Sequence, residues 1–144
     1  MTFPIQPDGL LCDVLVGLDG QTTTRLHAAG QAILPPVRCR GLIDTGTDVT
    51  CVAPAVLRRL GLNNPAHRTK THTVSGVAAV DLFEVSLSVA DLANLPGPML
   101  VLPSLQVLEV PGTLPNLDVL IGMDVLLTAR LLVDGPGRTF TLDF

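Results

Sequence analysis

The octapeptide Gly41-Leu42-Ile43-Asp44-Thr45-Gly46-Thr47-Asp48 is the most informative segment of the chain. It places an acid directly after a short apolar run, and the glycine two residues later lets backbone approach the carboxylate. An aspartate at the end of a strand also occurs in turns that have no chemical role. The octapeptide therefore allows two interpretations, a plain turn or a reactive carboxylate, and the rest of the chain has to decide between them.

The surrounding sequence predicts a mainly β protein. Short runs of Val, Leu and Ile alternate with clusters of Gly, Pro, Asn and Asp, as in antiparallel β domains. The length favours one domain, residues 1–144. The predicted strands cover residues 10–17, 22–28, 37–43, 49–53, 70–74, 83–89, 99–108, 117–121, 131–133 and 139–144, and the predicted short helices cover residues 54–60 and 123–129. Alternation of apolar and polar residues over 138–144 predicts an edge strand available for pairing.

Composition excludes several classes of function. Hydrophobic residues make up 47% and charged residues 15% of the chain, which indicates a compact body with an apolar surface or a buried interface. A net charge of −4, with no Trp, no Tyr and four Phe, argues against nucleic-acid binding. Three prolines interrupt the longest uncharged stretch, residues 92–108, so we expect no membrane span. Residues 1–9 lack the features of a secretory signal, and we expect a cytoplasmic protein.

The sequence offers no set of residues typical of a metal or cofactor site. Cys12, Cys39 and Cys51 contain no C-x-x-C pair, which argues against both a disulfide framework and a zinc site. The three histidines are too scattered to be interpreted as ligands of one ion. We therefore expect buried thiols, no metal and no cofactor.

A second motif gives the octapeptide its context. Leu42-Ile43-Asp44-Thr45-Gly46 is followed, well toward the C-terminus, by Leu120-Ile121-Gly122 at the start of a predicted helix. This pair of motifs, in this order, resembles the retroviral-like aspartic proteases, the retropepsins, and the resemblance spans residues 37–132. It implies a closed or folded antiparallel β domain with one or two short helices, working as a C2 homodimer that hydrolyses peptides.

The resemblance also implies roles for individual residues. Asp44 would be catalytic, Thr45 would bond the partner's loop, and Gly46 would admit backbone N–H groups. A hairpin flap between the motifs would have its tip near Ser75-Gly76. The implied substrate contacts are Thr47, Asp48, Val74, Ser75, Gly76, Val77 and Ile121. Retroviral members carry an arginine where this chain has Met123, which leaves the partner of Asp48 open.

Chemistry favours a dimer independently. Peptide hydrolysis by carboxylates needs one ionised aspartate as base and one protonated aspartate as acid, and this chain has a single Asp-Thr-Gly. A two-fold axis would supply the second Asp44 from another copy. The alternatives are a catalytically silent dimerisation or peptide-binding module with the same fold, and a structural β domain with a chance Asp-Thr-Gly.

Thr47 leads to an expectation about pH. If its hydroxyl reaches Asp44, it favours the ionised carboxylate and moves the activity profile toward acid. If the hydroxyl faces backbone instead, Thr47 merely fits the turn.

Overall fold

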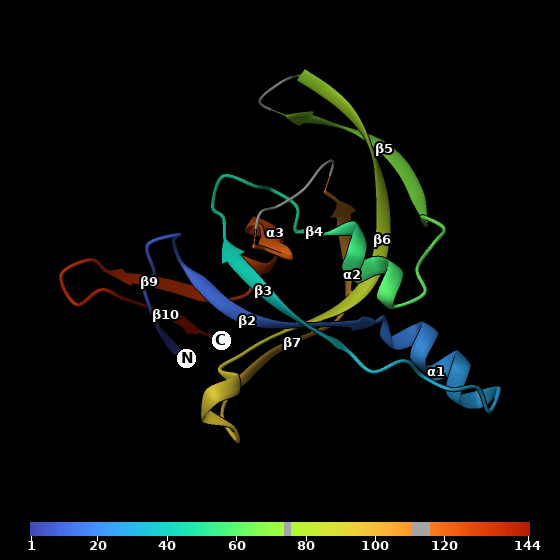
Figure 1. Ribbon diagram of the computed structural model, residues 1–144, viewed down its shortest axis with the longest axis horizontal. Helices are drawn as coiled ribbons and strands as arrows, with labels where there is room; N and C mark the ends of the chain where they lie inside the picture. Colours follow the sequence, from blue (N-terminus) through green and yellow to red (C-terminus); the bar gives the residue numbers. More distant parts are fainter. Residues whose placement is uncertain (74–75, 111–115) are drawn as a thin grey trace.

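A computed structural model describes residues 1–73, 76–110 and 116–144 (Figure 1). Its strands are β1 (Thr2–Pro4), β2 (Leu11–Leu18), β3 (Val37–Ile43), β4 (Cys51–Val52), β5 (His67–Thr73), β6 (Gly76–Ala90), β7 (Met99–Glu109), β8 (Val119–Ile121), β9 (Arg130–Asp134) and β10 (Thr139–Asp143). The helices are α1 (Gly20–Ala28), α2 (Pro54–Arg59) and α3 (Met123–Leu126), with a 3-10 turn η1 (Leu92–Asn94).

The larger sheet closes on itself. Its strand order is β2-β3-β8-β4-β7-β6-β5, and a further pairing of β2 with β6 joins the ends of the ring, leaving β5 outside and paired with β6. Most pairings are antiparallel, while β3–β8 and β4–β7 are parallel. The predicted mainly β, closed antiparallel fold is therefore confirmed. The paired strands β5 and β6 form a hairpin that extends from the body (Figure 1).

The period of two along β3 explains how the core forms. Val37, Cys39 and Ile43 face inward and are buried, whereas Arg38 is exposed and Arg40 is half-buried. Apolar residues from β2, β6, β7 and β8 join them in one core cluster, which α2 and α3 cover with Leu57 and Val125. The strand that leads to Asp44 is thus fixed by buried side chains along its whole length.

A second, three-stranded sheet holds the two ends of the chain together, in the order β1-β10-β9. The amino group of Met1 donates to the carbonyl of Leu142 at 2.7 Å. The expected edge strand at residues 138–144 is wrong, because β10 is the central strand, with β1 on one side and β9 on the other. Its alternating pattern reflects burial of Phe140 and Leu142 in the core.

The helix α1 corrects another expectation, a strand over residues 22–28. The run of β-branched Thr22, Thr23 and Thr24 favours a strand, but Asp19 caps a helix by accepting the N–H of Thr22 at 2.9 Å. With α1 the described residues contain three α-helices, not one or two. None of the α1 residues is buried, so its local capping decides its conformation.

Candidate active site

The Asp44 loop, residues 44–50, begins where β3 and β8 end side by side. Ile43 is aligned with Ile121 in the parallel ladder, and the N–H of Asp44 donates to the carbonyl of Ile121 at 2.9 Å. On the other side, the N–H of Ile43 donates to the carbonyl of Leu10. The two apolar motifs of the sequence therefore lie next to each other, and the loop starts from a backbone held on both sides.

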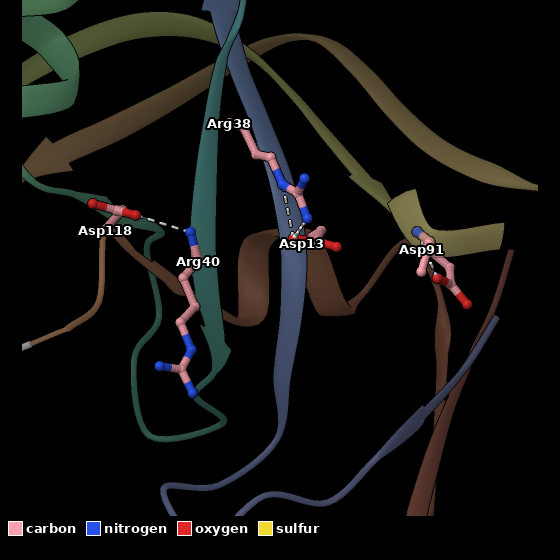
Figure 2. A network of polar contacts seen from close by, with 6 residues as sticks. Asp13, Arg38, Arg40, Asp91 and Asp118 are labelled. Atoms are coloured by element: carbon pink, nitrogen blue, oxygen red, sulfur yellow. Dashed lines mark hydrogen bonds and ion pairs between the residues drawn. The ribbon is translucent and has the colours of Figure 1, made fainter. Parts of the chain in front are cut away.

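Two polar contacts hold β3 nearer its start, at Arg38 and at Arg40 (Figure 2). Arg38 donates to the carboxylate of Asp13 on β2, at 3.0 Å from Nη2. The carboxylate of Asp118, just before β8, accepts the backbone N–H of Arg40 at 2.9 Å. The Arg38 pair is exposed and adds little stability, but the Asp118 contact ties β3 to the segment that enters β8.

Both carboxylate oxygens of Asp44 accept hydrogen bonds from its own loop. The N–H of Gly46 donates to Oδ1 at 3.0 Å, and the hydroxyl of Thr47 donates to Oδ2 at 2.6 Å. Asp44 is half-buried, and its hydrogen bond with Gly46 is exposed whereas that with Thr47 is partly buried. Hydrogen bonds of this kind fix the orientation of the carboxylate. The expected contact of Thr47 with Asp44 is confirmed, and the alternative in which its hydroxyl faces backbone is wrong.

Thr45, Gly46 and Asp48 are exposed in the single chain. The side chain of Thr45 makes no hydrogen bond to any other residue that the structure describes, and its expected bond to a partner's loop stays a prediction. Asp48 is joined to α3 through its backbone, since its carbonyl accepts the N–H of Asp124 at 3.1 Å. No described side chain pairs with the Asp48 carboxylate.

Thr50 and Asp124 form a polar contact that sequence reasoning did not predict. Thr50 is fully buried, and its hydroxyl donates to Oδ1 of Asp124 while accepting the N–H of Gly122. A side chain on Gly122 would be 2.8 Å from the carbonyl oxygen of Thr47 and 2.9 Å from the nitrogen of Thr50. The glycine is therefore required by close approach of the Asp44 loop. In the sequence, the one sign of the Thr50–Asp124 contact is Asp124 itself, an acid in the first turn of the predicted helix.

The predicted substrate contacts outside the loop fall in different places. The carbonyl of Ile121 accepts the N–H of Asp44. The residue is fully buried, which argues against direct contact of its side chain with a substrate. Gly76 and Val77 lie at the start of β6, where Thr73 and Gly76 pair across the hairpin, and Val77 is 60% exposed. Val74 and Ser75 lie outside the described residues. A flap formed by this hairpin stays a prediction.

The three cysteines are free thiols. Burial raises the pKa of Cys12 and of Cys39 to about 12. Burial, with the nearby carboxylates of Asp124 and Asp44, raises the pKa of Cys51 to about 11. A thiol with so high a pKa is a poor nucleophile at neutral pH. Among the described residues, no three His, Cys, Asp or Glu side chains gather in a group suited to a metal ion.

The described part of the chain also lacks any helix with the length and apolar character needed to span a membrane.

Comparison with known proteins places this site in a family. Residues 29–125 match the family model described as "Aspartyl protease". This match covers more than half of the chain and includes both motifs, so the chain belongs to the aspartyl protease family. No curated protein matches the sequence.

The chain is also similar to solved structures. A retropepsin-like aspartic protease from Rickettsia conorii is similar with a TM-score of 0.60 and 14% identity, over 100% of this chain and 90% of that chain. The retroviral protease-like domain of Ddi1 from Leishmania major gives a TM-score of 0.49 and 16% identity, over 93% and 89% of the two chains. The Rickettsia structure carries the argument, and the fold is that of the retropepsins.

Proposed function

We propose that the protein is a homodimeric aspartic endopeptidase whose active site combines Asp44 with Asp44 of the partner subunit. The observation that carries the proposal is the carboxylate itself: it is held at both oxygens by Gly46 and Thr47, and it remains partly open to solvent. The match to the aspartyl protease family and the alignment of Ile43 with Ile121 support this role over that of a plain turn aspartate. Among the described residues, no cation pairs with Asp44.

The reaction follows from two carboxylates that share one proton. The ionised Asp44 takes a proton from a water molecule between the two chains, and the water oxygen attacks the carbonyl carbon of the substrate. The protonated Asp44 of the partner subunit gives its proton to the carbonyl oxygen, which yields a tetrahedral diol. When the diol collapses, the C–N bond breaks, the amine nitrogen receives the proton taken from water, and one diol hydroxyl returns its proton to the other carboxylate.

The remaining residues of the site bind and orient in this proposal. Thr45 bonds the partner's loop and keeps the two carboxylates in one plane. Thr47 orients Asp44, and the exposed Asp48 binds the backbone of an extended peptide. The β5–β6 hairpin, with Gly76 and Val77, closes over the substrate and excludes water. The site requires a peptide or protein substrate and no metal or cofactor.

The test is a digest of a peptide mixture by the wild type and by Asp44→Asn, followed by mass spectrometry. We expect defined cleavage products from the wild type and none from the variant, while both proteins sediment as dimers. Equal cleavage by the two proteins would assign the reaction to other residues. A wild type that dimerises but cleaves no peptide at any pH would favour the alternative of a silent dimerisation or peptide-binding module.

A further inference from the structure

The strand β5 is the outer edge of the hairpin that extends from the body. It pairs with β6 over all 7 of its residues, with no shift of register, and it is the last strand of the larger sheet. Among the described residues, no strand pairs with its second side. A regular edge of this length presents backbone N–H and C=O groups that another extended chain can use.

This edge is polar and positively charged. β5 reads His67-Arg68-Thr69-Lys70-Thr71-His72-Thr73 and contains no Asp or Glu. The side chains of His67, Arg68 and Lys70 are exposed. Residues 49–80 as a whole include four Lys and Arg residues and no acid, in a chain whose net charge is −4. Positive charge is therefore concentrated on β5 and on the segment that leads to it.

An acid balances the charge of Arg68 but not that of Lys70. The guanidinium of Arg68 donates from Nε to Oδ1 of Asp81, directly opposite on β6, at 2.7 Å, and Glu109 lines the same hollow at the base of the hairpin. Lys70 lies opposite Ala79 and forms no ion pair with any residue that the structure describes. The ammonium group of Lys70 is therefore available to an anion from another molecule.

The charges of β5 argue against pairing with a second copy of β5. An antiparallel pair with its two-fold axis at Arg68, Thr69 or Lys70 places cationic side chains directly opposite each other, which destabilises the pair. Cationic side chains on an edge strand are one of the ways in which proteins prevent such pairing. An acidic strand in the same place puts opposite charges across from each other instead. The occupant that complements this edge is therefore acidic.

An extended peptide fits this edge better than a nucleic acid does. Proteins that bind single strands of nucleic acid combine cationic side chains with aromatic side chains on which the bases stack. The described residues of the hairpin from 67 to 73 and from 76 to 82 include no Phe, Tyr or Trp. A peptide strand uses both features that β5 offers, because its backbone bonds the open edge and its carboxylates face the cations.

The edge also belongs to the hairpin that closes over the substrate in the proposed function. β5 and β6 extend together from the body (Figure 1), and β6 continues into the body, where it pairs with β2 and β7. A chain bound along β5 is therefore held in a fixed relation to the body. A strand of seven residues spans about 23 Å, so a segment of similar length can lie along it.

We propose that β5 binds an acidic, extended segment of the protein substrate as an added strand, outside the residues that are cleaved, with Lys70 as the specificity-determining residue. The proposal rests on the proposed function, because the ligand is the substrate of that reaction. It goes further by naming the class of substrate, proteins with several Asp or Glu residues in an extended segment near the cleaved bond. Binding at β5 raises the effective concentration of the cleavable segment at Asp44.

A binding measurement tests this contact without cleavage. The Asp44→Asn protein is titrated into a fluorescent peptide in which Glu alternates with Thr, and the anisotropy gives Kd. We expect Kd to rise about tenfold or more when Gln replaces every Glu, which removes the charges, and when the backbone nitrogens are methylated, which removes the N–H donors. Unchanged binding of either peptide overturns the proposal. Oligothymidylate that displaces the peptide at an equal concentration of charges overturns it too, since the surface would then bind any polyanion.

A charge swap assigns the contact to Lys70. We expect Lys70→Glu to bind the acidic peptide about tenfold or more weakly, and to bind a peptide with Lys in place of every Glu more tightly than the wild type does. This gain of binding also shows that the variant is folded. Arg25→Glu is the matched control, because Arg25 is an exposed cation on α1, outside the hairpin. An unchanged affinity of Lys70→Glu for the acidic peptide, or an equal loss in Arg25→Glu, overturns the proposal.

Kinetics separate the docking from the reaction. Two peptides share one cleavable segment, and one of them carries an acidic extension. We expect the extension to lower KM about fivefold or more in the wild type, and the ratio of the two KM values to approach one in Lys70→Glu. If the protein binds the acidic peptide but cleaves nothing, the proposed function fails and the docking stands. If it cleaves through Asp44 with equal KM values for the two peptides, the docking proposal fails and the proposed function stands.

Discussion

Thr50 and Asp124 join the end of the Asp44 loop to α3 by two hydrogen bonds. The N–H of Thr50 donates to Oδ2 of Asp124 at 2.9 Å, and the hydroxyl of Thr50 donates to Oδ1 at 2.7 Å. Asp44 and Thr50 are the two ends of the loop, and each is tied to the segment around Gly122. The position of the carboxylate therefore depends on contacts between parts of the chain that are far apart in sequence.

Thr50→Val tests this contact. Valine has nearly the same shape, but it leaves the buried N–H of Gly122 without its acceptor and removes a donor to Asp124. We expect the free energy of unfolding to fall by about 1–3 kcal/mol, the cost of leaving a buried polar group unsatisfied. Urea unfolding measures it. The control is Thr2→Val, whose hydroxyl bond to Thr141 is exposed and whose loss should cost under about 0.5 kcal/mol. Equal effects at the two positions would contradict the assigned role of Thr50.

Gly122→Ala tests the close approach of the same loop. The added methyl group would meet backbone atoms of Thr47, Val49 and Thr50, which cannot move aside as a flexible side chain can. We expect a loss of about 1–3 kcal/mol in the free energy of unfolding and a large loss of peptide cleavage. Gly135→Ala is the matched control, because nothing lies within 4 Å of its added carbon. A stable and active Gly122→Ala protein would mean that the loop is not packed as described.

Thr47→Ala tests the hydrogen bond that orients Asp44. The Thr47 hydroxyl donates to Oδ2 of Asp44 at 2.6 Å. Without this donor the carboxylate can turn away from its orientation, and we expect kcat/KM for one peptide to fall about tenfold or more, since a hydrogen bond to a charged group contributes about 1.5–3 kcal/mol. Thr47→Ser retains a hydroxyl and should keep most of the wild-type activity. The measurement compares the three proteins on one peptide under conditions in which all remain dimeric. Thr47→Ala with the same kcat/KM as the wild type would refute the orienting role of this hydrogen bond.

The rates at which the cysteines react test their burial and their raised pKa values, and this test needs no substrate. With its pKa raised from 9.0 to about 11, Cys51 has roughly 100-fold less thiolate than an ordinary cysteine at pH 8. We expect iodoacetamide to label Cys51 far more slowly in the folded protein than in urea, with Cys12 and Cys39 slower still because their pKa values are about 12. Mass spectrometry of the labelled peptides gives the rates. Labelling of Cys51 at the same rate in both states would contradict its described environment.

Sequence patterns predicted the parts of the fold that obey one local rule. The strand Val37–Ile43 was predicted with its observed bounds, because its buried and exposed residues alternate. Residues 22–28 were predicted as a strand but belong to the helix Gly20–Ala28, because the sequence pattern of three threonines does not reveal that Asp19 caps a helix. The central place of β10 could not be predicted either. Which side of a strand is covered depends on β1 and β9, which alternation within β10 does not specify.

The candidate site was also predicted only where a local sequence pattern indicates it. The motif around Asp44 and its neighbour around Gly122 were identifiable from the chain, since each combines an apolar run with a glycine. The Thr50–Asp124 contact was not, because one threonine among many becomes important only when the fold buries it. Ile121 shows the converse: its place in the motif suggested a substrate contact, whereas the ladder with β3 turns its side chain into the core.

If one active site uses Asp44 from two chains, mixing wild-type chains with Asp44→Asn chains should reveal it. Wild type and Asp44→Asn are unfolded together in equal amounts and refolded, so that chains pair at random. If each site needs both carboxylates, only dimers of two wild-type chains are active. The mixture should then show about a quarter of the cleavage rate of the same total amount of wild type. A rate of about half would contradict the account, because each wild-type chain would then be working with its own Asp44 alone.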